Sequence, residues 1–269
     1  MTSHPMTFRP PAYIEMLRCT LLGHLRSRMA VLLAVAFIPA WIMVARLCAP
    51  DRTLRFSLEP RGTDVLAPAN HVSQVVNALA AVTLVTGFSM FMETFKAGET
   101  DRRLVLAGYP KLQMLLAKVT AVALVTAVIA VYTMAVLGSS LPVRQPGPLA
   151  LAVFGAGLAY GGIGLLLGSL VRGELEGFFL VIMLSLVDTG LQNPVLNVAD
   201  LTGLSALPLY GACQAALTAA FTSRTPWSYG LLSFAWSAAT SALALLAFHV
   251  RTRPHCRIAT EALAETPHP

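Results

Sequence analysis

Six long apolar stretches, separated by short polar segments, dominate the sequence. They cover residues 29–49, 72–95, 112–137, 149–171, 178–193 and 228–250. A helix needs about 20 apolar residues to cross the hydrocarbon core of a bilayer, and all but the stretch 178–193 approach or exceed that length. A seventh apolar stretch, 207–221, is too short to cross comfortably, which favours a re-entrant or interfacial helix. The pattern predicts an all-α membrane protein with six transmembrane helices and a re-entrant or interfacial helix between the fifth and sixth.

The segment before the first span has a different pattern. In residues 10–28, apolar side chains recur at helical spacing and charged ones lie between them. A basic amphipathic helix beside a span is typical of the membrane interface, so we expect an N-terminal elbow helix; a plain cytoplasmic tail is the alternative. The predicted organisation is a tail and elbow helix at 1–28, a six-span domain at 29–250, and a second tail at 251–269.

Composition agrees with a membrane location. Only 12% of the residues are charged and 56% are hydrophobic, whereas about 25% are charged in an ordinary soluble domain. If the N-terminus is inside, 13 of the 19 Lys and Arg residues fall on the inner side, so both termini are expected in the cytoplasm of a multi-pass plasma-membrane protein. The net charge of +6 then reflects this bias, and we expect no nucleic-acid partner.

The densest charged stretch lies between the second and third spans, at 96–111. Positive-inside bias accounts for its basic residues, but it does not explain the acidic residues or the apolar segment 104–106 beside them. A charged element held between two spans is suited to contact a soluble partner. A solvated turn that only fixes the topology is the alternative. A second, shorter charged turn follows the fourth span, at 172–177.

Taken together, these features resemble an ABC-2-type transporter permease. The resemblance rests on the amphipathic elbow, the stretch GETDRRLVLAGYPKLQMLLAK at 98–118, the run GIGLLLGSLVRGELEGFF at 162–179, and the short fifth span followed by a non-spanning segment. It covers roughly residues 10–250. The first charged turn departs from the fuller acidic run of many family members, which leaves the subfamily and the cargo open.

The resemblance implies a dimer of six-span subunits, formed with a second permease copy or a paralogue, each resting on a separate cytoplasmic ATPase. The first inner turn would be the main contact with that ATPase, and the second turn a secondary contact. The residues that match these positions are Glu99, Asp101, Arg102, Arg103, Arg172, Glu174 and Glu176.

The chain itself lacks the motifs of an ATPase or a membrane-embedded hydrolase. It contains no GxxxxGK[ST] phosphate-binding loop and no HExxH metal pair. Ser89 and His249 fall at distant positions of the predicted topology, so no base is placed beside a nucleophile. We expect no enzyme and no cofactor on this chain, with ATP and Mg on the partner ATPase. A non-transporting scaffold or assembly protein is the alternative function.

Polar residues inside the predicted spans are candidates for a cargo path, because polar groups at membrane depth are costly. A cluster at the outer end of the fifth span could form a gate or merely end a helix, and two polar residues on the second span could hydrogen-bond to it. Apolar residues further along that span could line a path or pack against other helices. These candidates are Gln74, Asn77, Met90, Phe91, Asp188, Gln192 and Asn193.

Cargo, direction and one cysteine pair remain open at this point. No large outer domain is predicted, and the charges of the longest outer loop, 50–71, balance, so we expect export of a hydrophobic or amphipathic compound, such as a drug, an antibiotic, a lipid or a peptide. Cys48 and Cys213 both fall near the outer face. They could pair, or they could be two unrelated small apolar residues.

Overall fold

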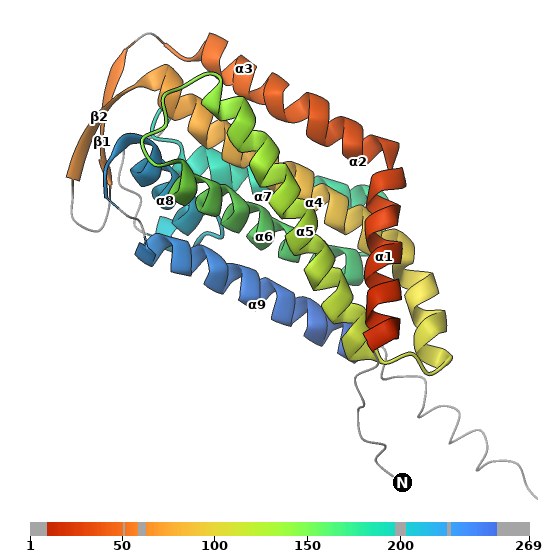
Figure 1. Cartoon of the computed structure of the whole chain (residues 1–269). Coiled ribbons are helices and arrows are strands. Elements are labelled where there is room, and N and C mark those ends of the chain that lie inside the picture. The colour runs from red at the N-terminus through yellow and green to blue at the C-terminus, as the bar shows by residue number, and fades with distance from the viewer. Residues whose placement is uncertain (1–9, 51, 59–62, 197–202, 225–226, 252–269) are drawn as a thin grey trace, which may run out of the picture.

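A bundle of long helices makes up most of the molecule (Figure 1). The structure is a computed structural model, and it describes residues 10–50, 52–58, 63–196, 203–224 and 227–251. In order, its elements are α1 (Pro10–Arg26), α2 (Arg28–Leu32), the π-helical η1 (Leu33–Phe37), α3 (Ile38–Cys48), β1 (Thr53–Leu58), β2 (Thr63–Pro68), α4 (Ala69–Leu106), α5 (Lys111–Gly138), α6 (Pro146–Leu170), α7 (Glu174–Gln192), the short η2 (Leu204–Ala206), α8 (Tyr210–Phe221) and α9 (Trp227–Arg251).

Helix α1 lies across one end of the bundle, and the β1–β2 hairpin lies at the opposite end (Figure 1). The phenol of Tyr13 donates a 2.7 Å hydrogen bond to Thr120 Oγ1 on α5. The outward side of α1 exposes Ile14, Leu22 and Leu25 next to Arg18. Residues 10–26 are therefore helical where the elbow was predicted, and the exposed apolar side chains of this helix suit a membrane interface. Its position relative to a bilayer stays a prediction.

The first predicted span is one rod with a π-helical segment just before Pro39. Proline has no N–H to donate to the carbonyl of Val35, four residues earlier, and its ring crowds that carbonyl. The phenol of Tyr132 on α5 donates to this oxygen at 2.8 Å. The helix is therefore locally widened before Pro39, and a neighbouring helix satisfies the freed carbonyl.

Residues 50–71, interpreted from the sequence as a loop, contain a β-hairpin. Strands β1 and β2 pair antiparallel, with Phe56 opposite Val65. Phe56 meets the ring of Phe221 on α8 edge-to-face, with centroids 6.4 Å apart. Arg55 and Asp64 form an exposed ion pair on the hairpin. The fold is predominantly helical, which is consistent with the predicted all-α membrane protein, and the structure adds one small hairpin.

Helix α4 is the longest element described, with 38 residues. At 1.5 Å per residue it is about 57 Å long, well beyond the ~30 Å hydrocarbon core. The sequence predicted a span at 72–95 followed by a separate charged turn at 96–111. The expected break in the helix after residue 95 is wrong, because α4 continues without interruption to Leu106 and carries the charged residues on its last turns. Where the membrane span ends stays a prediction. Lys, Glu and Arg are good helix formers, so nothing local stops the helix before Gly108.

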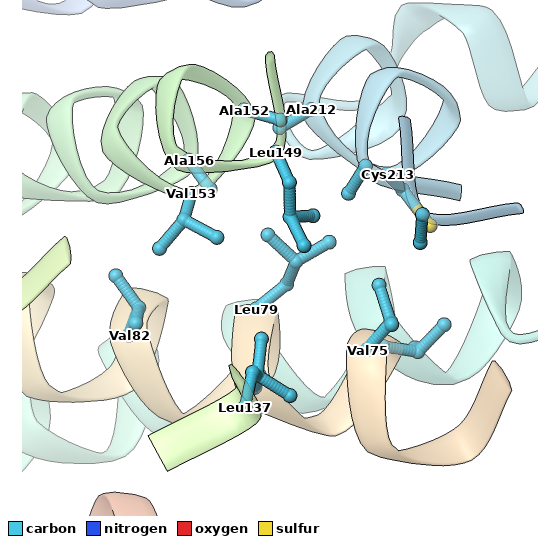
Figure 2. Packing of buried hydrophobic residues seen from close by; sticks show 14 of the residues in the cluster. Val75, Leu79, Val82, Leu137, Leu149, Ala152, Val153, Ala156, Ala212 and Cys213 are labelled. Carbon is cyan, nitrogen blue, oxygen red and sulfur yellow. The ribbon is translucent and has the colours of Figure 1, made fainter. Parts of the chain in front are cut away.

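Helix α6 is at the centre of the bundle and contacts α4, α5, α7, α8 and α9. Its glycines allow the close approach. A Cβ on Gly164 would lie 2.3 Å from the carbonyl oxygen of Gly87 on α4, and one on Gly168 would lie 2.9 Å from that of Phe91. Figure 2 shows side chains of α4, α5, α6 and α8 meeting in the core next to this crossing. The glycines of α6 therefore form a small-residue packing face against α4.

Four described helices are long and apolar enough to cross a membrane: Ala30–Cys48, Ala69–Leu106, Gln113–Gly138 and Pro146–Leu170. They match the first four predicted spans and support a membrane protein. Helices α7 and α9 match the fifth and sixth predicted spans in position, and α8 matches the predicted short segment. The six-span count, the re-entrant placement of α8 and the location of the termini stay predictions.

Candidate functional site

The charged residues of α4 and of the α6–α7 turn gather at one end of the bundle, the end that also holds α1 (Figure 1). Glu99 and Arg103 lie on the exposed side of α4, one turn apart, and their side chains approach to 3.5 Å. Both are more than four-fifths exposed. An exposed pair of this kind contributes little to stability, so its two charges are available to a partner. Arg102 is also on α4, but its side chain lies outside the described residues.

Asp101 is placed differently from its neighbours. Its carboxylate is buried and forms an ion pair with Lys118 on α5, and the two side chains are 3% and 5% exposed. Asp101 was predicted to face a soluble partner, but a direct contact would require this pair to open. The pair instead joins the ends of α4 and α5, so it acts as a brace within the helical hairpin. Lys118 also lines a small cavity with Thr94 and Leu165.

The turn between α4 and α5 is built by its own backbone. Gly108 has a φ of +88°, a conformation that favours glycine. The N–H of Tyr109 donates to Leu104 O at 3.0 Å, and that of Gly108 donates to Val105 O at 3.1 Å, which is the Schellman pattern of a helix C-terminus. Pro110 then precedes α5. Burial, and secondly the electrostatic effect of Cys19, raise the pKa of the Tyr109 phenol, which therefore stays neutral.

The second charged turn lies at the same end. Arg172, Glu174 and Glu176 are exposed, and both glutamates belong to the first turn of α7. Acidic side chains there stabilise the helix N-terminus through its dipole, so their charge has a local role whether or not a partner binds. The side chain of Glu176 folds back next to Gly173, where an added Cβ would lie 3.1 Å from the Glu176 carboxyl carbon.

A buried polar network surrounds Asp188, nearer the other end of the bundle. The Asp188 carboxylate accepts hydrogen bonds from the Tyr160 phenol at 2.6 Å, from the backbone N–H of Leu209 at 3.0 Å, and from the side-chain amide of Gln192. These donors come from α6, from the residue immediately before α8, and from α7 itself. Asp188 therefore ties three elements together, and its hydrogen bonds offset the cost of burying a carboxylate.

The other predicted polar residues do not join this network. Asn193 Oδ1 accepts a hydrogen bond from the N–H of Val195 at 3.0 Å. Asn193 directly follows the last residue of α7, so its position fits the interpretation as a helix end and not as a gate. Gln74 and Asn77 donate to their own helix backbone, to Asn70 O at 3.3 Å and Ser73 O at 2.9 Å. The predicted hydrogen bonds between the second span and the outer cluster are not among those the structure describes for these residues.

Met90 and Phe91 lie in the packed interior. Met90 is 1% exposed and Phe91 is fully buried. The Phe91 ring stacks on Phe95 at 5.6 Å, and a Cβ on Gly177 would collide with it at 2.1 Å. This placement favours the packing interpretation over a cargo path. Of the cysteines in the described part of the chain, Cys19, Cys48 and Cys213 are free, so Cys48 and Cys213 do not pair here.

Three contributors to these two groups were not identified as site residues from the sequence: Lys118, Tyr160 and the N–H of Leu209. The cue for Lys118 was its position, a single charge inside an apolar helix, because such a residue requires a partner. Tyr160 and Leu209 carried no comparable cue. Within the described ranges, no group of three or more His, Cys, Asp or Glu could hold a metal ion.

Comparison with known proteins adds no assignment. No family model matches the chain, and no curated protein matches it. The site must therefore be interpreted from its own geometry. At one end it offers exposed charges of both signs on a long rigid helix braced by a buried ion pair. Toward the other end it offers a buried, hydrogen-bonded carboxylate.

Proposed function

We propose that this chain is the membrane-spanning permease subunit of an ATP-driven transporter of ABC-2 type, and that a separate cytoplasmic ATPase subunit contacts its charged end. The observation that carries the proposal is helix α4. It is long enough to cross a bilayer and to project beyond it, and its projecting end carries the exposed Glu99 and Arg103. A push on this end would be transmitted along one continuous helix.

The buried Asp101–Lys118 pair supports the same role. It fixes the projecting end of α4 to α5, so that a force applied to one helix moves both. The close packing of Gly164 and Gly168 against α4 then links the motion to α6. In this proposal, Glu99, Arg102 and Arg103 provide the main contact, Arg172, Glu174 and Glu176 provide a second one, and Asp101 acts as a brace.

The remaining parts of the proposal follow from the same arrangement. The charged end would face the cytoplasm, together with both termini, with six spans in the plasma membrane. Exposed apolar side chains along α7, such as Phe179 and Val187, would face lipid or a second permease copy. Because the opposite end of the described chain carries only a hairpin and short connections, we propose export of a hydrophobic or amphipathic compound.

The test is co-purification of an ATPase subunit with the tagged chain from its native membranes. We expect Glu99→Lys/Arg103→Glu to reduce ATPase recovery strongly, because both exposed charges reverse without disturbing the buried pair. Arg52→Glu, an exposed charge reversal at the hairpin end, is the matched control and should retain the ATPase.

Two outcomes would contradict the proposal in different ways. If the ATPase remains bound to the Glu99→Lys/Arg103→Glu variant, the docking surface is wrong. If no ATPase accompanies the wild-type chain even after cross-linking in native membranes, the transporter proposal fails and a scaffold role takes its place.

A further inference from the structure

An apolar groove lies between α6, α8 and α9. It is lined by Pro148, Leu151, Ala215, Trp227, Leu231 and Phe234. Leu231 and Trp227 are 70% and 69% exposed, so the groove opens to the outside of the bundle. Because the helices on both sides are spans of the proposed topology, this groove would open to the hydrocarbon of the bilayer.

Two exposed arginines are located next to one end of the groove. Arg144 precedes the first turn of α6, and Arg224 precedes the first turn of α9. The side-chain amide of Gln145 holds the two segments together, donating to Thr222 O at 2.7 Å and to Arg224 O at 3.0 Å. The two cationic residues therefore belong to one local structure.

The two chain segments that carry these arginines have an unbalanced positive charge. Neither 138–150 nor 219–235 contains an acidic residue. In the described part of the chain, the ion pairs are Arg55–Asp64, Glu99–Arg103 and Asp101–Lys118, so Arg144 and Arg224 join none of them. Trp227 sits on the first turn of α9, and tryptophan favours the boundary between headgroups and hydrocarbon.

We propose that this groove binds an anionic phospholipid. An acyl chain would lie along Leu151, Leu231 and Phe234, and the phosphate would be held near the Arg144 and Arg224 guanidinium groups. The groove supplies apolar surface for the chain, and the arginines supply the charge complementarity that a neutral lipid would not use. The proposal goes beyond transport, because it needs neither an ATPase nor a cargo.

The test uses the fluorescence of Trp227 as a local probe. Trp41→Phe/Trp236→Phe leaves Trp227 as the one tryptophan of the chain. The purified protein is placed in phosphatidylcholine vesicles that contain either brominated phosphatidylglycerol or brominated phosphatidylcholine at the same mole fraction. Bromine quenches a tryptophan that it contacts. We expect several-fold stronger quenching by the brominated anionic lipid.

Two variants distinguish binding of the lipid headgroup from binding of the acyl chain. Arg144→Gln/Arg224→Gln should remove the preference for the anionic lipid, whereas Arg46→Gln/Arg52→Gln, which also removes two exposed arginines, should leave it unchanged. Gly230→Leu should lower quenching by both brominated lipids, because Gly230 lines the groove and an added Cβ meets nothing within 4 Å. The fold should therefore tolerate that change.

Equal quenching by the two lipids in the wild-type groove would overturn the proposal, and so would a preference that survives Arg144→Gln/Arg224→Gln. If neither lipid quenches Trp227 until the protein dissociates into monomers, a second copy of the chain occupies the groove and the lipid proposal is wrong.

Discussion

The Asp101–Lys118 pair is a buried ion pair at the charged end of the molecule. Its side chains are almost fully buried, whereas Glu99 and Arg103 on the same helix remain in solvent. Removing one member of a buried pair leaves an uncompensated charge, which costs about 3–5 kcal/mol. The buried Asp101–Lys118 pair can therefore be compared with the exposed Glu99–Arg103 pair, which lies within a few residues of it on α4.

We expect Asp101→Asn or Lys118→Met to lower stability by about 3 kcal/mol or more, measured as the midpoint of thermal unfolding in detergent. The double variant Asp101→Asn/Lys118→Met should be less destabilised than either single one, because no unpaired charge remains. Glu99→Gln/Arg103→Gln is the control and should cost less than about 1 kcal/mol. Equal losses for the buried and the exposed pair would contradict this assignment.

The hydrogen bond from Tyr132 to Val35 leads to a second prediction for single residues. Tyr132→Phe should cost about 1–2 kcal/mol, because it leaves the carbonyl that Pro39 orphans without a donor. Pro39→Ala restores an N–H to the helix, so Tyr132→Phe should cost clearly less in the Pro39→Ala background. Thermal unfolding of the four proteins of this double-mutant cycle measures the difference. Equal costs in both backgrounds would show that the phenol does not compensate for the proline.

At the level of the helices, the crossing of α4 and α6 depends on glycine. Gly164 has no room for a methyl group, because an added Cβ would lie 2.3 Å from the backbone oxygen of Gly87. Backbone does not move aside as a flexible side chain does, so the two helices would have to separate. Gly98, exposed on α4, has nothing within 4 Å of an added Cβ.

We expect Gly164→Ala to destabilise the protein by about 2 kcal/mol or more, since overpacking a close contact typically costs 1–3 kcal/mol. Gly98→Ala should be neutral or stabilising by about 0.5–1 kcal/mol, because alanine is the better helix former. The unfolding midpoints of the two variants measure whether each substitution lowers or raises the stability of the protein. A neutral Gly164→Ala would mean that α4 and α6 do not pack this closely in solution.

The sequence predicted the helices better than their connections. Apolar length alone placed five of the predicted spans and the short 207–221 segment within a few residues of a helix. The end of α4 was predicted too early, because the high density of charged residues was interpreted as a turn. The helix in fact ends just before Gly108, which has a positive φ. Leu54, Phe56 and Leu58 alternate with polar residues, which is a strand pattern. The charged residues and prolines of the same segment led to its interpretation as a loop.

The buried contacts of the site were harder to predict than its exposed residues. Gln192 lies one helical turn after Asp188, so their contact follows from local geometry. Tyr160 and Lys118 reach their partners from other helices, and the register between two antiparallel helices depends on side-chain packing along their whole length. The sequence pattern does not contain that register, so neither pair could be predicted.

For the molecule as a whole, the arrangement of the helices constrains the topology. α4, α5, α6, α7 and α9 alternate in direction along the bundle (Figure 1). The turns after α4 and α6 therefore lie at one end, and the hairpin and the α5–α6 connection lie at the other. Exposed Arg172 and Arg103 belong to the first end, which agrees with the predicted cytoplasmic side. Whether α7 and α9 cross the bilayer decides between four spans and six.

Ser223, exposed between α8 and α9, distinguishes these two topologies. With six spans it lies outside, because α7 returns the chain to the outer face. A four-span topology would place it inside, on the side of the α6–α7 turn, and would require the hydrogen bonds from Gln145 to Thr222 O and Arg224 O to break. In a chain whose four native cysteines are replaced by serine, Ser57→Cys and Thr100→Cys provide the outer and inner references. We expect a membrane-impermeant maleimide added to intact cells to label Ser223→Cys and Ser57→Cys but not Thr100→Cys. Labelling of Ser57→Cys alone would contradict six spans and remove the basis for a re-entrant α8, while leaving the α4–α5 hairpin and its charged end in place.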